Sequence, residues 1–210
     1  MLNKKYLITN SLKLFIMKNK TFKLITTLKV VALVVITSFS LASCSTDETN
    51  ESASLEKRAP AKGNASIAEI ASNAGFNELI SALVYVDSEL NTGFVNLFAN
   101  GKDQYTVFAP TDQAFKNLYS ALNVNSITEL PAPLVRDVLL YHVAEGRRAA
   151  NSVVPKNGTR EITTLLGNQF SVTPNGSINA IGNSATITTA NISASNGIIH
   201  VIDTVLLPIK

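Results

Sequence analysis

The spacing of apolar residues changes once along this chain, between about residues 150 and 160, and this change limits the folds that it can adopt. Before the change, apolar side chains recur at every third or fourth position, which predicts amphipathic helices. After Arg160 the pattern becomes that of short strands separated by turn residues. A helical half followed by a β half predicts an α+β fold, with helices on one side of a mostly antiparallel sheet.

The expected elements can be placed by their boundary residues. In the first half we expect one short strand over Tyr105–Ala109 and helices over Ile67–Asn73, Phe76–Val84, Leu90–Phe98, Asp112–Leu122 and Leu134–Val143. In the second half we expect strands over Glu161–Leu165, Gln169–Pro174, Ser177–Ala180, Thr186–Ala190, Ile192–Ala194 and Ile198–Leu207.

Two Asn-Gly pairs and an apolar run describe the end of the chain. Asn175-Gly176 and Asn196-Gly197 predict type I′ hairpin turns, which need positive φ at both central residues. The run Ile198–Leu207 is apolar on both faces, so we expect a central strand covered on both sides. His200 and Asp203 would then be at least partly buried, and they would point to opposite faces, which argues against a catalytic dyad.

The N-terminus has the pattern of an export signal. Lysines up to Lys29 precede an apolar run, Val30–Leu41, and the sequence Leu-Ala-Ser then leads to Cys44. We interpret residues 1–43 as a signal peptide whose true start is Met17. Leu-Ala-Ser-Cys resembles the bacterial lipobox, in which the thiol accepts a lipid, so Cys44 is the predicted lipidation site and the membrane is a predicted partner.

Two other interpretations of this region stay open. Cys44 could be an ordinary thiol that follows an ordinary signal, or residues 24–41 could be an uncleaved membrane span. Lys29 interrupts the second candidate and leaves it shorter than the ~20 apolar residues that a crossing needs. Cys44 is the only cysteine of the 210 residues, so no disulfide or cysteine-based metal site can form within one chain.

Residues 44–62 form a predicted flexible tether, because they are rich in polar residues and have little to bury. Asp47-Glu48 resembles the signal that sends some Bacteroidetes lipoproteins to the cell surface, or it is simply part of a solvated tether. Seven of the 18 Lys and Arg lie in the leader, which leaves 11 basic and 15 acidic side chains, net −4, from Cys44 onward. The basic pI is therefore no argument for nucleic-acid binding.

Three blocks in the folded part resemble the fasciclin (FAS1) family. They are Tyr105–Phe115, which reads YTVFAPTDQAF, Leu139–Val143, which reads LLYHV, and Asn196–Pro208, which reads NGIIHVIDTVLLP. Their order fits one complete domain over residues 63–210. The resemblance implies a β-sandwich or wedge of about seven strands with helices along its edge. It also implies extracellular adhesion or matrix association, with no general catalytic activity and no cofactor.

The motif residues also have a structural interpretation. Thr111 can cap a helix and Asp112 can face its positive end. In the family, Tyr141 and His142 have been linked to adhesion; we expect His142 to pack in the core with hydrogen bonds and Tyr141 to bury its ring. The remaining motif residues, which we interpret as structural, are Asn196, Gly197, His200 and Asp203.

Several functions remain in competition. The leading hypothesis is a surface-anchored module that binds cell-surface or matrix polysaccharide or protein. A periplasmic accessory or ligand-binding lipoprotein is the alternative. An envelope-polymer hydrolase fits less well, because the chain lacks a Gly-x-Ser-x-Gly elbow and a His-Glu-x-x-His motif. Arg147-Arg148, with Lys156 and Arg160, could contact acidic polysaccharide, although a solvated charge run is the simpler interpretation.

Overall fold

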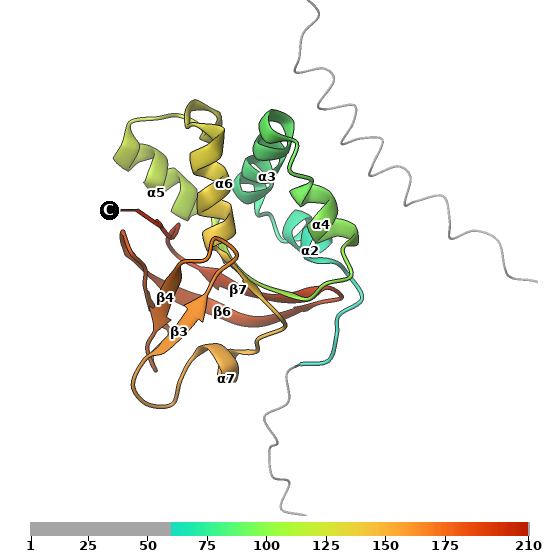
Figure 1. Cartoon of the computed structure of the whole chain (residues 1–210), viewed down its shortest axis with the longest axis vertical. Helices are drawn as coiled ribbons and strands as arrows, with labels where there is room; N and C mark the ends of the chain where they lie inside the picture. Colours follow the sequence, from blue (N-terminus) through green and yellow to red (C-terminus); the bar gives the residue numbers. More distant parts are fainter. Residues whose placement is uncertain (1–59, 210) are drawn as a thin grey trace, which may run out of the picture. The chain divides into compact units, whose positions relative to one another are not determined.

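The computed structural model describes residues 60–209 (Figure 1). The predicted signal peptide, the predicted lipidation site Cys44 and the tether up to residue 59 lie outside the described residues. The described part is helical at first and then mostly β, so the expected α+β fold with about seven strands is confirmed. In Figure 1, helices α2 (Ile67–Asn73) to α6 (Ala132–Tyr141) lie together on one side of the strands, and the short helix α7 (Ala150–Val153) lies on the other side.

Most helices begin and end close to the predicted residues, but α3 continues six residues beyond the predicted end at Val84. Their bounds are α2 Ile67–Asn73, α3 Asn77–Leu90, α4 Phe94–Asn100, α5 Asp112–Leu122, the 3₁₀ helix η1 Ile127–Glu129, α6 Ala132–Tyr141 and α7 Ala150–Val153. The predicted helix over Leu90–Phe98 is wrong at its start. Asn91 and Gly93 have positive φ, at 54° and 76°, which ends α3 before α4 begins.

Seven strands pair in the order β2-β1-β7-β6-β5-β4-β3 within the described residues. Their bounds are β1 Tyr105–Pro110, β2 Val143–Glu145, β3 Arg160–Thr163, β4 Gln169–Val172, β5 Ser177–Asn179, β6 Ser184–Ala194 and β7 Gly197–Ile202. Every pair is antiparallel except β1 with β7. Leu165 N, just after β3, donates to Val143 O in β2, 2.8 Å away. This bond links the two ends of the strand order, so the sheet is barrel-like.

Three strand predictions were wrong in their limits. Thr186–Ala190 and Ile192–Ala194 belong to one strand, β6, whose register shifts on both sides of Thr189. Such bulges break the alternation that the prediction relied on. The last run stops pairing at Ile202 rather than at Leu207, because the chain turns away there and continues as a buried irregular segment. Strand β2 was missed, because Val143 was placed in the preceding helix.

The predicted type I′ turns are also wrong. In the β4–β5 hairpin only Gly176 has positive φ, at 79°, and Gly176 N donates to Thr173 O. This is a turn closed by a left-handed glycine, which sequence spacing does not separate from type I′. In the β6–β7 hairpin the turn is Ser195-Asn196, because Ala194 pairs with Gly197. Gly197 is already part of β7.

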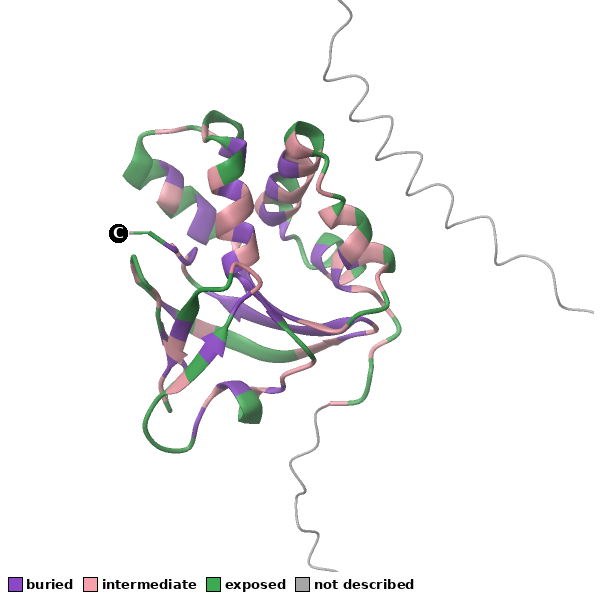
Figure 2. Ribbon diagram, in the orientation of Figure 1, coloured by how far each residue is buried: buried purple, intermediate pink, exposed green. Residues whose placement is uncertain are grey.

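The core lies on both faces of the central strands. All six residues of β7 are buried, which confirms the predicted central strand (Figure 2). Ile199 and Val201 pack in one apolar cluster with residues of α2 to α6. Ile202 and the β1 residue Phe108 pack in a second cluster, which residues of β3, β4 and β5 fill from the opposite face. Both clusters therefore meet at the β1–β7 pair.

Gly197 is the one glycine of the β1–β7 pair, and it should be sensitive to substitution. A Cβ at Gly197 would lie 2.2 Å from Tyr105 O and 2.8 Å from Ile67 Cδ1, so Gly197→Ala must push β1 and β7 apart. We expect a loss of about 3 kcal/mol in the free energy of unfolding, at the upper end of overpacking costs. Denaturant unfolding measures this loss.

Gly167→Ala is the matched control. Gly167 has φ 90° with nothing within 4 Å of its Cβ position, so alanine there is strained only by its backbone conformation, which costs about 1–2 kcal/mol. An equal or smaller loss for Gly197→Ala would contradict the close approach.

Candidate functional site

The first motif block joins strand β1 to helix α5. Thr111 is the N-cap of α5, and its Oγ1 accepts a hydrogen bond from Ala114 N, 3.2 Å away. Asp112 is the first helical residue, where a carboxylate is stabilised by the positive end of the helix dipole. Both placements agree with the structural interpretation of this block.

Asp112 also does something that sequence reasoning missed. Its carboxylate accepts hydrogen bonds from Glu78 N and Asn77 Nδ2, each 3.0 Å away. These groups belong to the first turn of α3, whose own N-cap, Phe76, supplies no side-chain acceptor. Asp112 therefore caps α3 from another helix and ties α5 to it. No local signal reveals such a contact, because it depends on how the helices pack.

Tyr141 is fully buried at the end of α6. Its hydroxyl donates to Gln169 O, 2.9 Å away, and accepts from Ile181 N, 3.3 Å away. Its ring packs edge-on against Phe170. Burial raises the pKa of the phenol, so the hydroxyl stays protonated. Tyr141 thus bridges α6 to strand β4 and to the loop after β5.

His142 is also buried, with 3% of its surface exposed. Its Nε2 accepts from Leu206 N, 2.9 Å away, so the proton is on Nδ1, which donates to Val138 O at 2.6 Å. Burial lowers the pKa of the imidazole to about 4. The ring is therefore neutral near pH 7, and both of its nitrogens are occupied by the main chain. The expected buried and hydrogen-bonded histidine is confirmed.

His200 has a similar environment in the middle of β7. Its Nε2–H donates to Arg148 O, 2.9 Å away, while Nδ1 accepts from Asn191 N at 3.4 Å. Burial lowers its pKa as well. Asp203 follows the end of β7 and is exposed, so its expected burial was wrong; its Oδ1 accepts from Thr186 N, 2.8 Å away. His200 and Asp203 therefore share no hydrogen-bond partner.

Asn196 and Gly197 connect the β6–β7 hairpin to the helices. Asn196 is buried; its Oδ1 accepts from Ile67 N, 2.8 Å away, and its Nδ2 donates to Phe98 O, 2.9 Å away. One amide therefore satisfies main-chain groups of both α2 and α4. Gly197 lies beside it because β1 leaves no room for a Cβ. These two residues are structural, but not for the turn geometry that the sequence suggested.

Arg147 is not part of a solvated charge run. It is half-buried, and its guanidinium donates to Ala194 O at 2.9 Å and to Gly197 O at 2.5 Å in the β6–β7 hairpin. It also donates to Pro60 O and Ala61 O, each 3.1 Å away. We call this set of contacts the Arg147 clasp. It holds residues 60–61, which the sequence analysis assigned to the tether, against the hairpin and leaves this guanidinium little capacity for an external anion.

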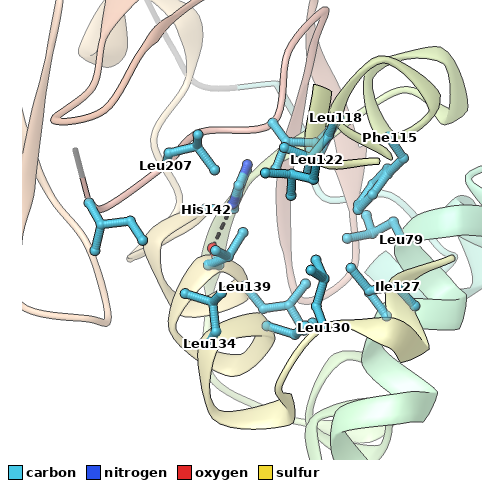
Figure 3. Close-up of a pocket in the computed structure, with 16 residues that line it drawn as sticks. Leu79, Phe115, Leu118, Leu122, Ile127, Leu130, Leu134, Leu139, His142 and Leu207 are labelled. Atoms are coloured by element: carbon cyan, nitrogen blue, oxygen red, sulfur yellow. Dashed lines mark hydrogen bonds between the residues drawn. The ribbon is translucent and has the colours of Figure 1, made fainter. Parts of the chain in front are cut away.

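An apolar pocket lies between α3, α5, α6 and the C-terminal segment Val205–Ile209 (Figure 3). Its volume is about 120 Å³, and His142 is the only lining residue that is not apolar. The other lining residues include Leu79, Leu118, Leu122, Leu134, Leu139 and Leu207. The sequence indicated that α6 is largely apolar, but it did not place α5 and the C-terminal segment beside it.

Two negative findings concern residues 60–209. No group of three or more His, Cys, Asp or Glu side chains there is arranged to hold a metal ion. The helices of this part are all too short or too polar to cross a membrane. The apolar pocket is therefore not accompanied, in the described residues, by a group of side chains that could hold a metal ion.

Comparisons with known proteins show what this chain is similar to. The family model described as "Fasciclin domain" matches residues 74–208. Protein sll1483 of Synechocystis sp. is 32% identical over 193 residues, which cover 87% of this chain and 98% of that protein. The cell surface glycolipoprotein MPB83 of Mycobacterium bovis is 32% identical over 141 residues, 66% of this chain and 60% of that protein. A solved FAS1 domain pair from the insect cell adhesion molecule Fasciclin I covers 61% of this chain and 45% of that chain, with 17% identity and a TM-score of 0.45.

The burial of His142 predicts a loss of stability in acid. Its pKa is about 4 in the fold and 6.5 in the unfolded chain, so between these values the unfolded chain binds more protons. Stability is therefore full above pH 6.5 and falls as the pH drops toward 4, by up to about 3 kcal/mol. His200 contributes in the same direction.

Denaturant unfolding at pH 7, 5.5 and 4.5 measures this loss. His142→Gln should be less stable at pH 7 but should depend less on pH, whereas His200→Gln should keep the larger part of the dependence. An unchanged pH slope in His142→Gln would contradict the assignment.

The Arg147 clasp predicts that one guanidinium protects the start of the folded domain. Arg147→Ala removes one donor from each of four carbonyl groups, of which Ala61 O still accepts from Ser193 Oγ, and should lower the free energy of unfolding by about 2 kcal/mol. It should also speed trypsin cleavage after Lys62, which directly follows the clasped residues. Mass spectrometry of timed digests measures this cleavage.

Arg148→Ala is the matched control for the clasp. The Arg148 side chain donates to Glu145 O, three residues away, and to no group of residues 60–62. Its removal should leave cleavage after Lys62 unchanged. Equal rates in the two variants would mean that Arg147 does not hold this segment.

Proposed function

The chain belongs to the fasciclin family, and we propose that it is a lipid-anchored envelope protein whose single fasciclin domain acts in adhesion or matrix association. The domain binds a cell-surface or matrix polysaccharide or protein, and it does so without catalysis. The family is known mainly for extracellular adhesion, and its members are in general not enzymes. Neither a cofactor nor nucleic acid takes part.

The observation that carries the non-catalytic assignment is the state of the two histidines. Each imidazole has both ring nitrogens bonded to main-chain groups. A general base needs a free nitrogen within reach of substrate, and these nitrogens have none to offer. His142 and His200 are the only histidines of the whole sequence. An active site built on the family motifs is therefore disfavoured.

The proposed anchor rests on the N-terminal sequence. Leu-Ala-Ser-Cys44 follows a basic and then apolar leader, and the tether that follows is polar. The name of a relative, the cell surface glycolipoprotein MPB83, supports this proposal. We propose that Cys44 carries the lipid and that the domain faces the exterior. Asp47-Glu48 would serve as the surface-export signal.

The motif residues Tyr141 and His142 support the fold in this proposal, and the binding surface lies elsewhere. Both side chains are buried, and their hydrogen bonds go to main-chain groups of β4, of the loop after β5 and of the C-terminal segment. A partner on the outside cannot contact them without opening the core. Loss of adhesion in variants of this motif would then follow from loss of the folded domain.

One observation favours the alternative, a periplasmic accessory or ligand-binding lipoprotein. The apolar pocket is lined almost wholly by hydrocarbon side chains, which is the usual lining of a small-molecule site. A ligand held in this pocket would leave the rest of the domain surface available for adhesion, so the same chain can do both.

Tyr141→Phe is the sharpest test of the motif's role. It removes one hydroxyl that serves Gln169 O and Ile181 N, so we expect a loss of about 1–3 kcal/mol in the free energy of unfolding. Cells that display the variant should adhere to matrix-coated surfaces as wild-type cells do, at any temperature where the domain is folded. Lost adhesion at an unchanged melting temperature would mean that Tyr141 binds the partner.

Two controls separate anchoring from binding in this experiment. Cys44→Ala should abolish adhesion of cells while the released domain stays folded. Protease treatment of intact cells should digest the wild-type domain. A domain that is protected from the protease faces the periplasm, which would contradict the surface assignment.

A further inference from the structure

The apolar pocket has the volume and lining of a site for a small hydrocarbon group. An engineered cavity of about 150 Å³ lined by Leu, Ile and Phe stays dry and binds benzene. The pocket here has a volume of about 120 Å³ and the same kind of lining. We propose that it binds a small uncharged hydrophobic molecule, with a hydrocarbon part the size of an aromatic ring or a short branched alkyl chain.

The lining excludes charged and strongly polar ligands. His142 is the only polar residue in it, and both ring nitrogens are already bonded, to Val138 O and Leu206 N. The imidazole therefore presents only its ring carbons to the pocket. A water molecule there would find no free partner, and a charged ligand would lose its hydration without compensation. An uncharged hydrocarbon group has no hydrogen bonds to water to lose when it enters the pocket.

The walls are fixed before any ligand arrives. The C-terminal segment forms one wall, and four hydrogen bonds hold it, one of them from Gly182 N to Leu207 O. Leu206 N donates to His142 Nε2, Leu207 N donates to Asn183 Oδ1 at 3.0 Å, and Asn183 Nδ2 donates to Val205 O at 2.7 Å. Helices α5 and α6 form the facing walls (Figure 3). Binding therefore needs no ordering of this segment, which lowers its entropic cost.

Exposed apolar side chains at the mouth of the pocket are the surface that a bound ligand could remove from water. Leu122 is 47% exposed and Ile209 is 54% exposed, and both line the pocket. The third exposed large hydrophobic residue of the described part is Ile181. It precedes Gly182, whose N donates to Leu207 O beside the same mouth. Two of the three exposed large hydrophobic residues of the described part therefore line this pocket, and a bound hydrocarbon would cover part of their surface.

The test uses the full chain carrying Cys44→Ser, isolated without detergent so that no lipid or detergent competes. Benzene is the probe, and benzoate is the matched charged probe with the same ring. Benzene should raise the melting temperature and shift the methyl NMR signals of Leu118, Leu134 and Leu207 in a saturable way. Benzoate should do neither. No saturable shift with benzene, or equal shifts with both probes, would overturn the proposal.

Variants locate the binding. Leu134→Trp fills the pocket from α6 and should weaken benzene binding at least about tenfold, which is 1.4 kcal/mol. Leu207→Trp fills it from the opposite wall and replaces the first variant if that one does not fold. Ile181→Trp is the matched control, because Ile181 is exposed beside the mouth but does not line the pocket, and its affinity should be unchanged.

Two further arms separate other occupants of the pocket. Sedimentation without probe should give a monomer; a dimer that Leu134→Trp dissociates would mean that a second copy covers the pocket, which overturns the proposal. Phosphatidylcholine vesicles should not reproduce the methyl shifts, because a membrane surface offers long chains rather than a free small molecule. Shifts with vesicles and none with benzene would also overturn it.

Discussion

The parallel pairing of β1 with β7 is the contact on which the rest of this domain depends. Parallel strands need a long crossover connection, and here the crossover contains α5, α6 and all the other strands. The pair is buried on both faces, so every polar group in it needs an internal partner. Thr106 Oγ1 donates to Gly146 O and accepts from Arg148 N, and His200 is bonded at both nitrogens. The pair thereby fixes the segment after β2.

This dependence explains why the family motifs lie where they do. The first block is β1 with the start of α5, and the last block is β7 with the segment that follows it. The middle block supplies Tyr141 and His142, which bond to β4, to the loop after β5 and to the C-terminal segment. The motifs therefore mark the residues that hold a non-local pairing together. Within the described residues, the buried side-chain atom left without a partner is Gln104 Oε1, at the entry to β1.

The sequence predicted what depends on local periodicity and failed where contact between distant segments decides. The α+β order, the cap at Thr111 and the buried histidine that follows α6 can all be predicted from local patterns. The end of β7 did not, because an apolar run has the same composition in a paired strand and in a buried irregular segment. The hydrogen bond from α3 to Asp112 and the Arg147 clasp were missed for the same reason. Each joins a side chain to main-chain groups that only the tertiary fold brings near.

The position of the Arg147 clasp has a mechanical consequence. A pull that reaches the domain through residue 60 first meets Arg147, which joins residues 60–61 to the turn end of the β6–β7 hairpin. The load then passes into two strands at the centre of the strand order rather than into an edge strand. Edge strands can be unzipped one bond at a time, whereas a central pair with neighbours on both sides must shear several bonds together. If the protein is held by its N-terminus while a partner pulls on the domain, this position of the attachment would make the fold resist mechanical unfolding.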